Sequence, residues 1–230
     1  MRIAILQSSY IPWKGYFDLI NTVDEFVLFD TVQFTRRDWR NRNRIKTPAG
    51  PAWLTIPVHS KGHYLAPINE IEVSDESWGA RHWRTLVRSY ARAPYFRTYA
   101  DRFERLYVEC REARLSAINF AWITAICEIL EIRTRLTWSM DYQLVEGKTE
   151  RLVEICRQAG ATTYLSGPAA RNYIQPEIFE AAGVELEYFS YQGYREYSQL
   201  FPPFDHHVSI LDLLFNEGPN ATRFMLSFNP

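Results

Sequence analysis

The sequence concentrates positive charge in one short segment that could hold an anion. Six lysine or arginine residues and one aspartate lie between Arg36 and Lys46, whereas the whole chain has a formal net charge of −1. Arginine presents a planar fork of N–H donors that matches phosphate oxygens. We therefore predict that this segment binds an anion, with phosphate or pyrophosphate as the first choice. A solvated charged loop is the alternative interpretation.

Aromatic and amide side chains within the same segment make nucleic acid a second candidate ligand. Trp39, Asn41 and Asn43 are interspersed with the basic residues, a mixture that would also suit the acceptor end of a tRNA. The pI of about 6.5 argues against a large nucleic-acid footprint, although not against a short acceptor end.

Polar residues also follow the first two predicted strands, at 3–6 and 25–30. In open α/β sheets, ligands bind at the carboxyl ends of strands, beside the loop that enters the next helix. A helix that begins near Gly15 would further favour a phosphate at its N-terminus. Both loops should share one edge of the sheet, where they contribute these candidate residues: Gln7, Lys14, Asp30 and Gln33.

Histidine is the usual general base, because its pKa lies near neutrality. His82 and Tyr90 lie on the apolar face of a helix predicted over 77–91, so His82 is the preferred candidate. A hydrogen-bonded core histidine is the alternative. The pair His206 and His207 is not interpreted as a metal site, because adjacent histidine side chains diverge in most backbones.

Two further motifs have features of a binding or catalytic site. Gly147-Lys148-Thr149 resembles a phosphate loop, but Tyr142 stands where the full motif requires glycine, so a helix cap is preferred. Ser166 ends a short predicted strand, and Tyr173 follows it within reach of the same edge. No Gly-x-Ser-x-Gly elbow surrounds Ser166, which disfavours a serine hydrolase.

The order of the predicted elements indicates an α/β fold. Strand, helix and strand within the first 30 residues predict a parallel βαβ unit, and an α/β rhythm returns after residue 132. The prediction is one domain over 1–230, a three-layer, mostly parallel Rossmann-like sheet with an α-helical insertion at about 78–132. Further strands are predicted over 53–58, 67–73, 135–139, 162–165 and 184–188.

The cysteine spacing and the length of the apolar runs indicate the cellular compartment and whether a metal or cofactor is expected. The three cysteines have no CxxC or metal-ligand spacing, and such a sparse, odd set fits a reducing cytoplasm. No apolar run approaches the ~20 residues of a membrane helix, and the N-terminus lacks a signal-peptide layout. We therefore expect a cytoplasmic protein with no membrane span, no metal and no cofactor.

Many ordered motifs of the chain resemble those of the WbqC-like protein family. One departure is Ser8-Ser9, where the family leads us to expect proline after the glutamine. The motifs that carry the resemblance are Gln7, Pro12, Gly15–Phe17, Asp30–Phe34, Trp39–Ile45, Arg81–His82, Tyr90–Phe96, Tyr164–Gly167, Tyr173, Ser209–Asn216 and Gly218.

This resemblance implies a transferase of bacterial surface-polysaccharide (O-antigen, lipopolysaccharide) or natural-product biosynthesis. The implied reaction moves an acyl or aminoacyl group to an amino sugar or similar amine. The implied partner is a nucleotide-linked sugar or another phosphate-bearing small molecule, with a carrier protein or a charged tRNA as a donor.

Two other functions stay open. One is a nucleotidyl-transferring or ATP-dependent ligase on a nucleotidylyltransferase-like scaffold, although Lys14-Gly15-Tyr16 lacks the HxGH signature of that superfamily. The other is a non-catalytic binding or assembly protein.

For the transferase we assign predicted roles. Arg37 and Arg42 would hold a phosphate, His82 or Asp30 would accept the amine proton, and backbone N–H groups near Ser166 would stabilise an oxyanion. The other predicted substrate-binding residues are Gln7, Lys14, Gln33, Asn41, Asn43, Tyr90 and Tyr173.

Overall fold

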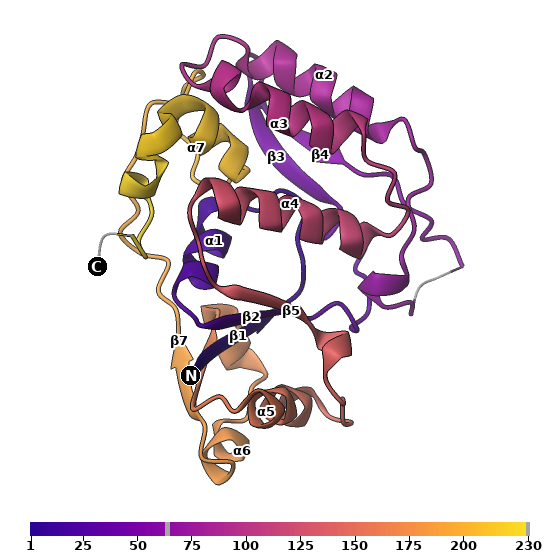
Figure 1. Ribbon diagram of the computed structural model, residues 1–230, viewed down its shortest axis with the longest axis vertical. Coiled ribbons are helices and arrows are strands. Elements are labelled where there is room, and N and C mark those ends of the chain that lie inside the picture. Colours follow the sequence, from indigo (N-terminus) through magenta and orange to yellow (C-terminus); the bar gives the residue numbers. More distant parts are fainter. Residues whose placement is uncertain (63–64, 229–230) are drawn as a thin grey trace.

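A five-stranded parallel sheet forms the centre of the protein (Figure 1). The structure is a computed structural model that describes residues 1–62 and 65–228. The strand order is β5-β2-β1-β6-β7, and every neighbouring pair is parallel. This confirms the predicted α/β class with a Rossmann-like sheet. The strands are β1 (Arg2–Leu6), β2 (Glu25–Leu28), β5 (Arg135–Trp138), β6 (Thr163–Ser166) and β7 (Glu185–Tyr188).

Helices cover both faces of this sheet, as the apolar character of its strands requires. Helices α1 (Lys14–Asn21) and α4 (Leu115–Ile129) lie on one face, and α5 (Lys148–Ala159) and α6 (Pro176–Ala181) lie on the other (Figure 1). Side chains of β1 alternate between the two cores. Ala4 packs in the core on the α1 side, whereas its neighbours on either side pack in the core on the α5 side.

The chain leaves two adjacent central strands toward opposite faces. After β1 it enters α1, and after β6 it passes through a 3₁₀ segment, η3 (Pro168–Asn172), to α6 on the other face. The loops that follow β1 and β6 therefore diverge at the carboxyl ends of neighbouring strands. Such a topological switch point is where open α/β sheets bind their ligands.

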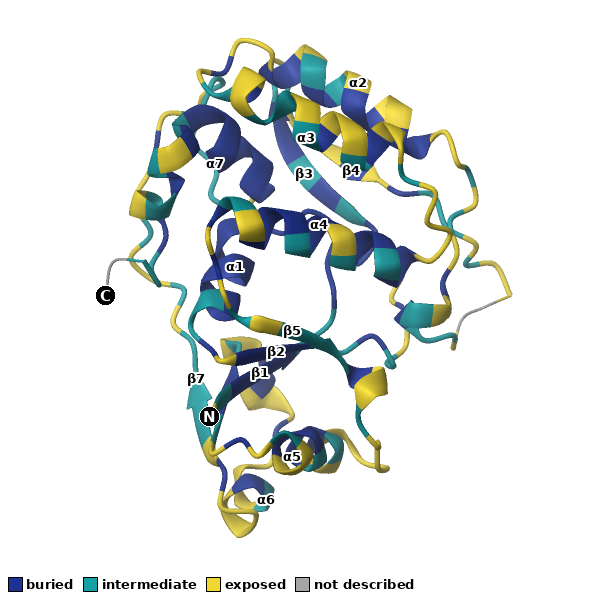
Figure 2. Ribbon diagram, viewed as in Figure 1, coloured by how far each residue is buried: buried dark blue, intermediate teal, exposed yellow. Residues whose placement is uncertain are grey.

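A second layer of structure lies beyond α4. It consists of α2 (Trp78–Tyr90), α3 (Phe96–Val108), α7 (Ile210–Glu217) and the antiparallel hairpin of β3 (Arg42–Thr47) and β4 (Gly50–Thr55) (Figure 1). These elements share one apolar core with α1 and α4, and α7 is buried along most of its length (Figure 2).

The helices predicted within the insertion are α2, α3 and α4. Since α4 also covers the sheet, the insertion boundary stays a prediction. Short 3₁₀ segments complete the chain as η1 (Ile68–Glu70), η2 (Ser139–Asp141) and η4 (Gly218–Phe224). Among the described residues, no helix has both the length and the apolar character needed to cross a bilayer.

The strand predicted over 67–73 was wrong. The chain instead forms η1, with isolated bridges at Glu72 and Val73. Ile68 and Ile71 are both fully buried, and a spacing of three residues places them on one side of a helical turn. A strand would have pointed them to opposite faces.

The basic segment contains a strand that its charge pattern does not predict. Arg42–Thr47 forms β3, in which Asn43 and Ile45 are buried while Arg42 and Arg44 are partly exposed. This alternation has the period of a strand, but the high charge concealed it. The hairpin register places Arg44 opposite Trp53 of β4.

Helices α2 and α3 approach so closely at Gly79 that no larger residue fits. A Cβ atom added there would lie 2.0 Å from the carbonyl oxygen of Tyr107. We expect Gly79→Ala to lower the free energy of unfolding by about 1–3 kcal/mol, as overpacking does, measured by urea denaturation. Ala80→Ser, on the exposed neighbour, should change it little. Equal stability of Gly79→Ala and wild type would contradict this packing.

Candidate functional site

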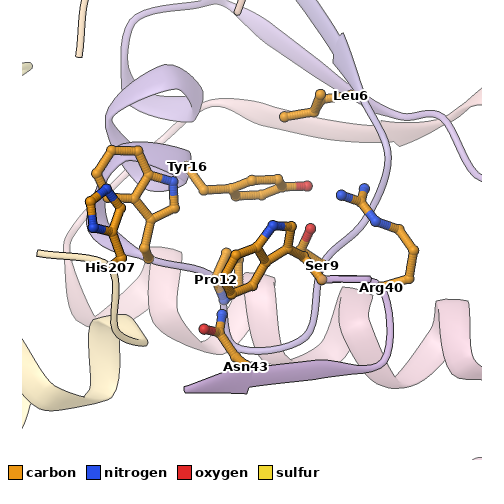
Figure 3. A pocket seen from close by; sticks show the side chains of 9 residues that line it. Leu6, Ser9, Pro12, Tyr16, Arg40, Asn43 and His207 are labelled. Carbon is orange, nitrogen blue, oxygen red and sulfur yellow. The ribbon is translucent and has the colours of Figure 1, made fainter. Parts of the chain in front are cut away.

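A cavity of about 320 Å³, here called the β1 crevice, lies at the carboxyl end of β1 (Figure 3). Its walls come from β1, the loop into α1, the chain entering β3 and the segment before α7. The lining residues are Leu6, Ser9, Pro12, Trp13, Tyr16, Trp39, Arg40, Asn43 and His207.

Arg40 supplies a buried cation to this crevice. Its residue surface is only 9% exposed, and its Nη1 donates to the Gln7 side-chain oxygen at 3.2 Å. Its Nε is buried and has no hydrogen-bond partner among residues 1–62 and 65–228, and the Asp38 carboxylate lies 3.9 Å away, beyond hydrogen-bonding distance. The guanidinium points toward the Tyr16 hydroxyl (Figure 3). A buried cation this weakly paired favours an anionic ligand.

Backbone contacts between the β1 loop and the basic segment hold Arg40 in place. The Asn43 side chain donates to the carbonyls of Tyr10 and Ile11 at 3.1 and 2.9 Å, and the Tyr10 N–H donates to the Trp39 carbonyl at 3.0 Å. Ile11 has a φ of 38°, a conformation that is costly for a β-branched residue. Such strain persists where the surrounding contacts over-determine the backbone, often at functional sites.

Asp30 is an anchor beneath the crevice. It is fully buried, and its carboxylate accepts hydrogen bonds from the Ser8 N–H at 2.8 Å and from the Ser116 hydroxyl. Burial raises its pKa, while these hydrogen bonds and the nearby Arg40 act in the opposite direction. Both carboxylate oxygens of Asp30 already accept hydrogen bonds inside the protein. Its predicted catalytic role stays a prediction.

His207 brings an accessible imidazole to the crevice. Its ring stacks on Trp13 with centroids 6.1 Å apart, its side chain is 73% exposed, and its Nδ1 lies 3.5 Å from the Asp205 carboxylate. Arg44 fixes this segment by donating to the His207 carbonyl at 3.0 and 3.2 Å. Sequence reasoning considered His207 only as a metal ligand, because nothing in the sequence places it beside β1.

Gln7 and Lys14 are the two binding residues predicted in the loop after β1. Gln7 accepts a hydrogen bond from Arg40, which lines the crevice. Lys14 directly follows Trp13, another lining residue of the crevice. Lys14 is buried as the first residue of α1, and its Nζ donates to the Arg195 carbonyl at 3.3 Å. The rings of Tyr194 and Tyr197 lie 4.7 and 5.1 Å from that nitrogen. Burial lowers the pKa of Lys14 to about 8.

Three other predicted residues line a separate cavity of about 200 Å³, here called the arginine cleft. Arg37, Asn41 and Arg42 share it with Arg36 and with residues of β4 and the chain that follows. Gln33 is exposed and forms an isolated bridge with Pro67. The basic segment therefore serves two cavities, with Arg40 in the crevice and its neighbours in the cleft.

Tyr173 borders a third cavity, of about 400 Å³, on the α5 side of the sheet edge. Gln7, Lys148, Arg151 and Tyr164 are among its lining residues. Ser166 is buried at the end of β6, with its hydroxyl 3.4 Å from that of Tyr164. The stabilisation of an oxyanion by backbone N–H groups near Ser166 stays a prediction.

His82 and Tyr90 lie in the aromatic core and line none of these three cavities. The His82 ring nitrogens lie 2.9 Å from the Tyr10 hydroxyl and 3.1 Å from the Thr55 carbonyl. Tyr90 donates to Asp212 at 2.8 Å. The structure does not bring either residue to the basic segment's two cavities, so the catalytic role of His82 stays a prediction without geometric support.

The fold and crevice define a doubly wound α/β protein with an arginine-lined crevice at its switch point. The chain matches the WbqC-like protein family over residues 7–224, and it belongs to that family. A protein of Mycobacterium tuberculosis (strain ATCC 25618 / H37Rv), named "Uncharacterized protein Rv1507c", is 48% identical over 224 residues, covering 97% of each chain. No solved structure matches the chain significantly.

The position of His82 predicts a pH dependence of stability. Burial lowers its pKa from 6.5 to about 4. Between these values the unfolded chain binds a proton that the folded protein does not, so this contribution to stability is lost as the pH falls below 6.5. The effect between pH 7 and pH 5 is about 2 kcal/mol.

Urea denaturation at both pH values, compared with His82→Gln, measures this effect. The wild type should lose about 2 kcal/mol more stability than the variant between pH 7 and pH 5. The buried carboxyls of Asp30 and Asp212 have raised pKa values and change stability in the opposite direction, but they contribute equally to both proteins. Parallel curves for the two proteins would contradict a neutral, buried His82.

Proposed function

We propose that this protein is a transferase that holds a phosphate-bearing amino sugar in the β1 crevice and receives an acyl or aminoacyl group on its amine. The observation that carries this proposal is the buried guanidinium of Arg40, which faces a cavity at the switch point and, among the described residues, has no carboxylate within hydrogen-bonding distance. A phosphate or pyrophosphate of a nucleotide-linked sugar would supply the missing acceptors.

The remaining walls of the crevice suit a sugar ring. Trp13, Trp39 and Tyr16 present aromatic faces and edges around Arg40, and such amphipathic rings pack on apolar faces while leaving polar edges to donors. The Ser9 hydroxyl and the Asn43 side chain add polar groups at the floor. A cavity with a predominantly aromatic wall and a few convergent polar groups is typical of small-molecule sites.

His207 is the side chain best placed to accept a proton. The amine nitrogen forms a bond to the acyl carbon of the donor, the bond from that carbon to the leaving oxygen or sulfur breaks, and the amine loses one proton. His207 accepts this proton and returns it to the leaving group. Asp205, at 3.5 Å from Nδ1, would orient the ring, as a carboxylate does for a catalytic histidine.

This activity agrees with the implied place of the family in surface-polysaccharide or natural-product biosynthesis, where amino sugars receive acyl groups. The same proposal covers the donor classes named from the sequence, including a carrier protein and a charged tRNA.

Replacement of Arg40 tests ligand binding in the crevice. We expect Arg40→Met to weaken binding of a UDP- or dTDP-linked amino sugar by about 30-fold or more, because the charged partner of the phosphate is removed. Arg40→Lys should give an intermediate loss, since an ammonium cannot form the two-pronged contact. Isothermal titration calorimetry measures both.

The control for charge is Arg97→Met, on an exposed arginine of α3, which should bind like the wild type. Circular dichroism melting confirms that each variant folds. If Arg40→Met binds the amino sugar with the affinity of the wild type, the proposed binding site is wrong.

Replacement of His207 tests the assignment of the base. We expect His207→Ala to lower kcat by about 10²–10⁴-fold with little change in sugar binding. His206→Ala, at the adjacent histidine, is the matched control and should keep the wild-type kcat. Full turnover by His207→Ala would remove His207 from the mechanism.

The same assays separate the other two functions. Release of pyrophosphate from ATP or CTP, with no acyl transfer, would replace the proposal by nucleotidyl transfer or ligation. Sugar binding that depends on Arg40 but yields no product with any donor class would favour a binding or assembly protein.

A further inference from the structure

Two exposed tryptophans lie side by side at the β3–β4 hairpin, Trp53 in β4 and Trp39 in the chain that enters β3. Trp39 and Trp53 are 40% and 44% exposed, and their ring centroids lie 5.3 Å apart with the planes 41° from parallel. This tryptophan pair adjoins the β1 crevice, because Trp39 is also one of the crevice walls. Large rings left open to water beside a cavity mark a surface that a ligand covers.

Arginine side chains surround the tryptophan pair. The Arg42 guanidinium lies 4.0 Å from the centroid of the Trp53 ring, and that of Arg44 lies 5.9 Å from it. Arg42 also lines the arginine cleft, so the aromatic surface and the cleft share this side chain. Arg44 is already paired with Asp205 at 3.4 Å, which leaves Arg42 as the cation that connects the two features.

The arginine cleft has an excess of positive charge. Within residues 1–62 and 65–228, no ion pair is formed by Arg36, Arg37 or Arg42, and the cleft wall contains no carboxylate. The Nε of Arg42 is buried without a hydrogen-bond partner. The three guanidinium groups together therefore offer N–H donors for which the protein supplies no anion.

Two backbone and side-chain features indicate that the cleft is built rather than accidental. Asn41 is 7% exposed, and its amide nitrogen donates to the Ile56 carbonyl at 2.8 Å, while its Oδ1 has no partner in the described part of the chain. Arg37 has a φ of 58°, a left-handed conformation that is uncommon for a non-glycine residue. Arg42 donates to the Arg37 carbonyl and so holds that conformation.

We propose that the hairpin binds a nucleotide, with its phosphate in the arginine cleft and its base stacked on the tryptophan pair. Base stacking on aromatic side chains beside a basic groove is the common mode of binding for nucleotides without sequence preference. Only the role given to this nucleotide rests on the proposed function, in which the nucleotide would be the part of the acyl or aminoacyl donor that the protein binds. Thioesters of coenzyme A and aminoacyl esters at an RNA 3′ end both contain such a nucleotide.

The position of Trp39 connects this site to the reaction. Since its ring touches both the crevice and Trp53, a donor held on the hairpin would extend its acyl end toward the amine in the crevice. The chain's formal net charge of −1 fits a footprint of one or a few nucleotides rather than a long duplex.

The test uses the full-length protein and four probes, namely AMP, coenzyme A, a short single-stranded oligoribonucleotide and inorganic phosphate. Binding is measured by tryptophan fluorescence quenching and by titration calorimetry. We expect Trp53→Ala and the double variant Arg36→Ala, Arg42→Ala each to weaken nucleotide binding about tenfold or more. Trp53→Phe should recover part of the loss in Trp53→Ala, because the ring is retained, and Arg97→Ala should bind like the wild type.

The probes distinguish the source of the nucleotide. Tightest binding of coenzyme A would support a thioester donor, and tightest binding of the oligoribonucleotide an RNA-borne donor. Inorganic phosphate should bind more weakly than AMP and show no dependence on Trp53.

Three outcomes would overturn the proposal. They are no binding of any nucleotide at millimolar concentration, an equal loss in Arg97→Ala, and equal affinity for AMP and inorganic phosphate. Arg40→Met keeps this test separate from that of the crevice. With AMP added at saturation to occupy the hairpin, Arg40→Met should lose the UDP- or dTDP-linked amino sugar, and without competitor it should keep AMP. Loss of AMP would mean that nucleotides bind in the crevice instead. Normal AMP binding in a wild type that binds no amino sugar once AMP saturates the hairpin would overturn the proposed function alone.

Discussion

The attachment of the β1 loop to β3 by a single asparagine is the constraint on which the rest of the site depends. The Asn43 amide donates to two successive carbonyls, those of Tyr10 and Ile11. Since Asn43 is only 2% exposed, losing these bonds would leave buried carbonyls without partners. The contact joins the parallel sheet to the hairpin and thereby places Arg40 at the switch point, Trp39 at the crevice wall and Arg42 over Trp53.

Polar side chains buried in the layer beyond α4 have a structural role. His82 connects Tyr10 of the β1 loop to Thr55 of β4, and Asp212 of α7 accepts hydrogen bonds from Tyr90 and Tyr197. Each group is satisfied by a partner from a distant part of the chain, as buried polar groups must be. Burial lowers the pKa of His82 and raises that of Asp212, so both are held in their uncharged forms more strongly than in water. Such networks specify which elements pack together.

The turn before β3 separates the side chains of the basic segment, whereas the pleat of β3 keeps Arg42 and Arg44 on one face. Arg40 points into the crevice, Arg42 and Arg37 face the cleft, and Arg44 pairs with Asp205 near His207. The segment thus lines two separate cavities, and Trp39 belongs to the wall of the crevice. Under the proposed function this arrangement would suit a reaction with two substrates, because each would be held by its own cations.

The sequence by itself determined the class of fold and the chemistry of one segment. Apolar strands with polar residues at their carboxyl ends predicted the parallel sheet, and the density of arginine between Arg36 and Lys46 identified the segment that lines both the β1 crevice and the arginine cleft. Local patterns carry this information because the periods of strands and helices are local. Only the tertiary structure decided that Arg40 rather than Arg37 faces the crevice, that His82 lies in the core, and that His207 stands beside β1. These outcomes depend on packing between segments distant in the chain, and no local spacing encodes such contacts.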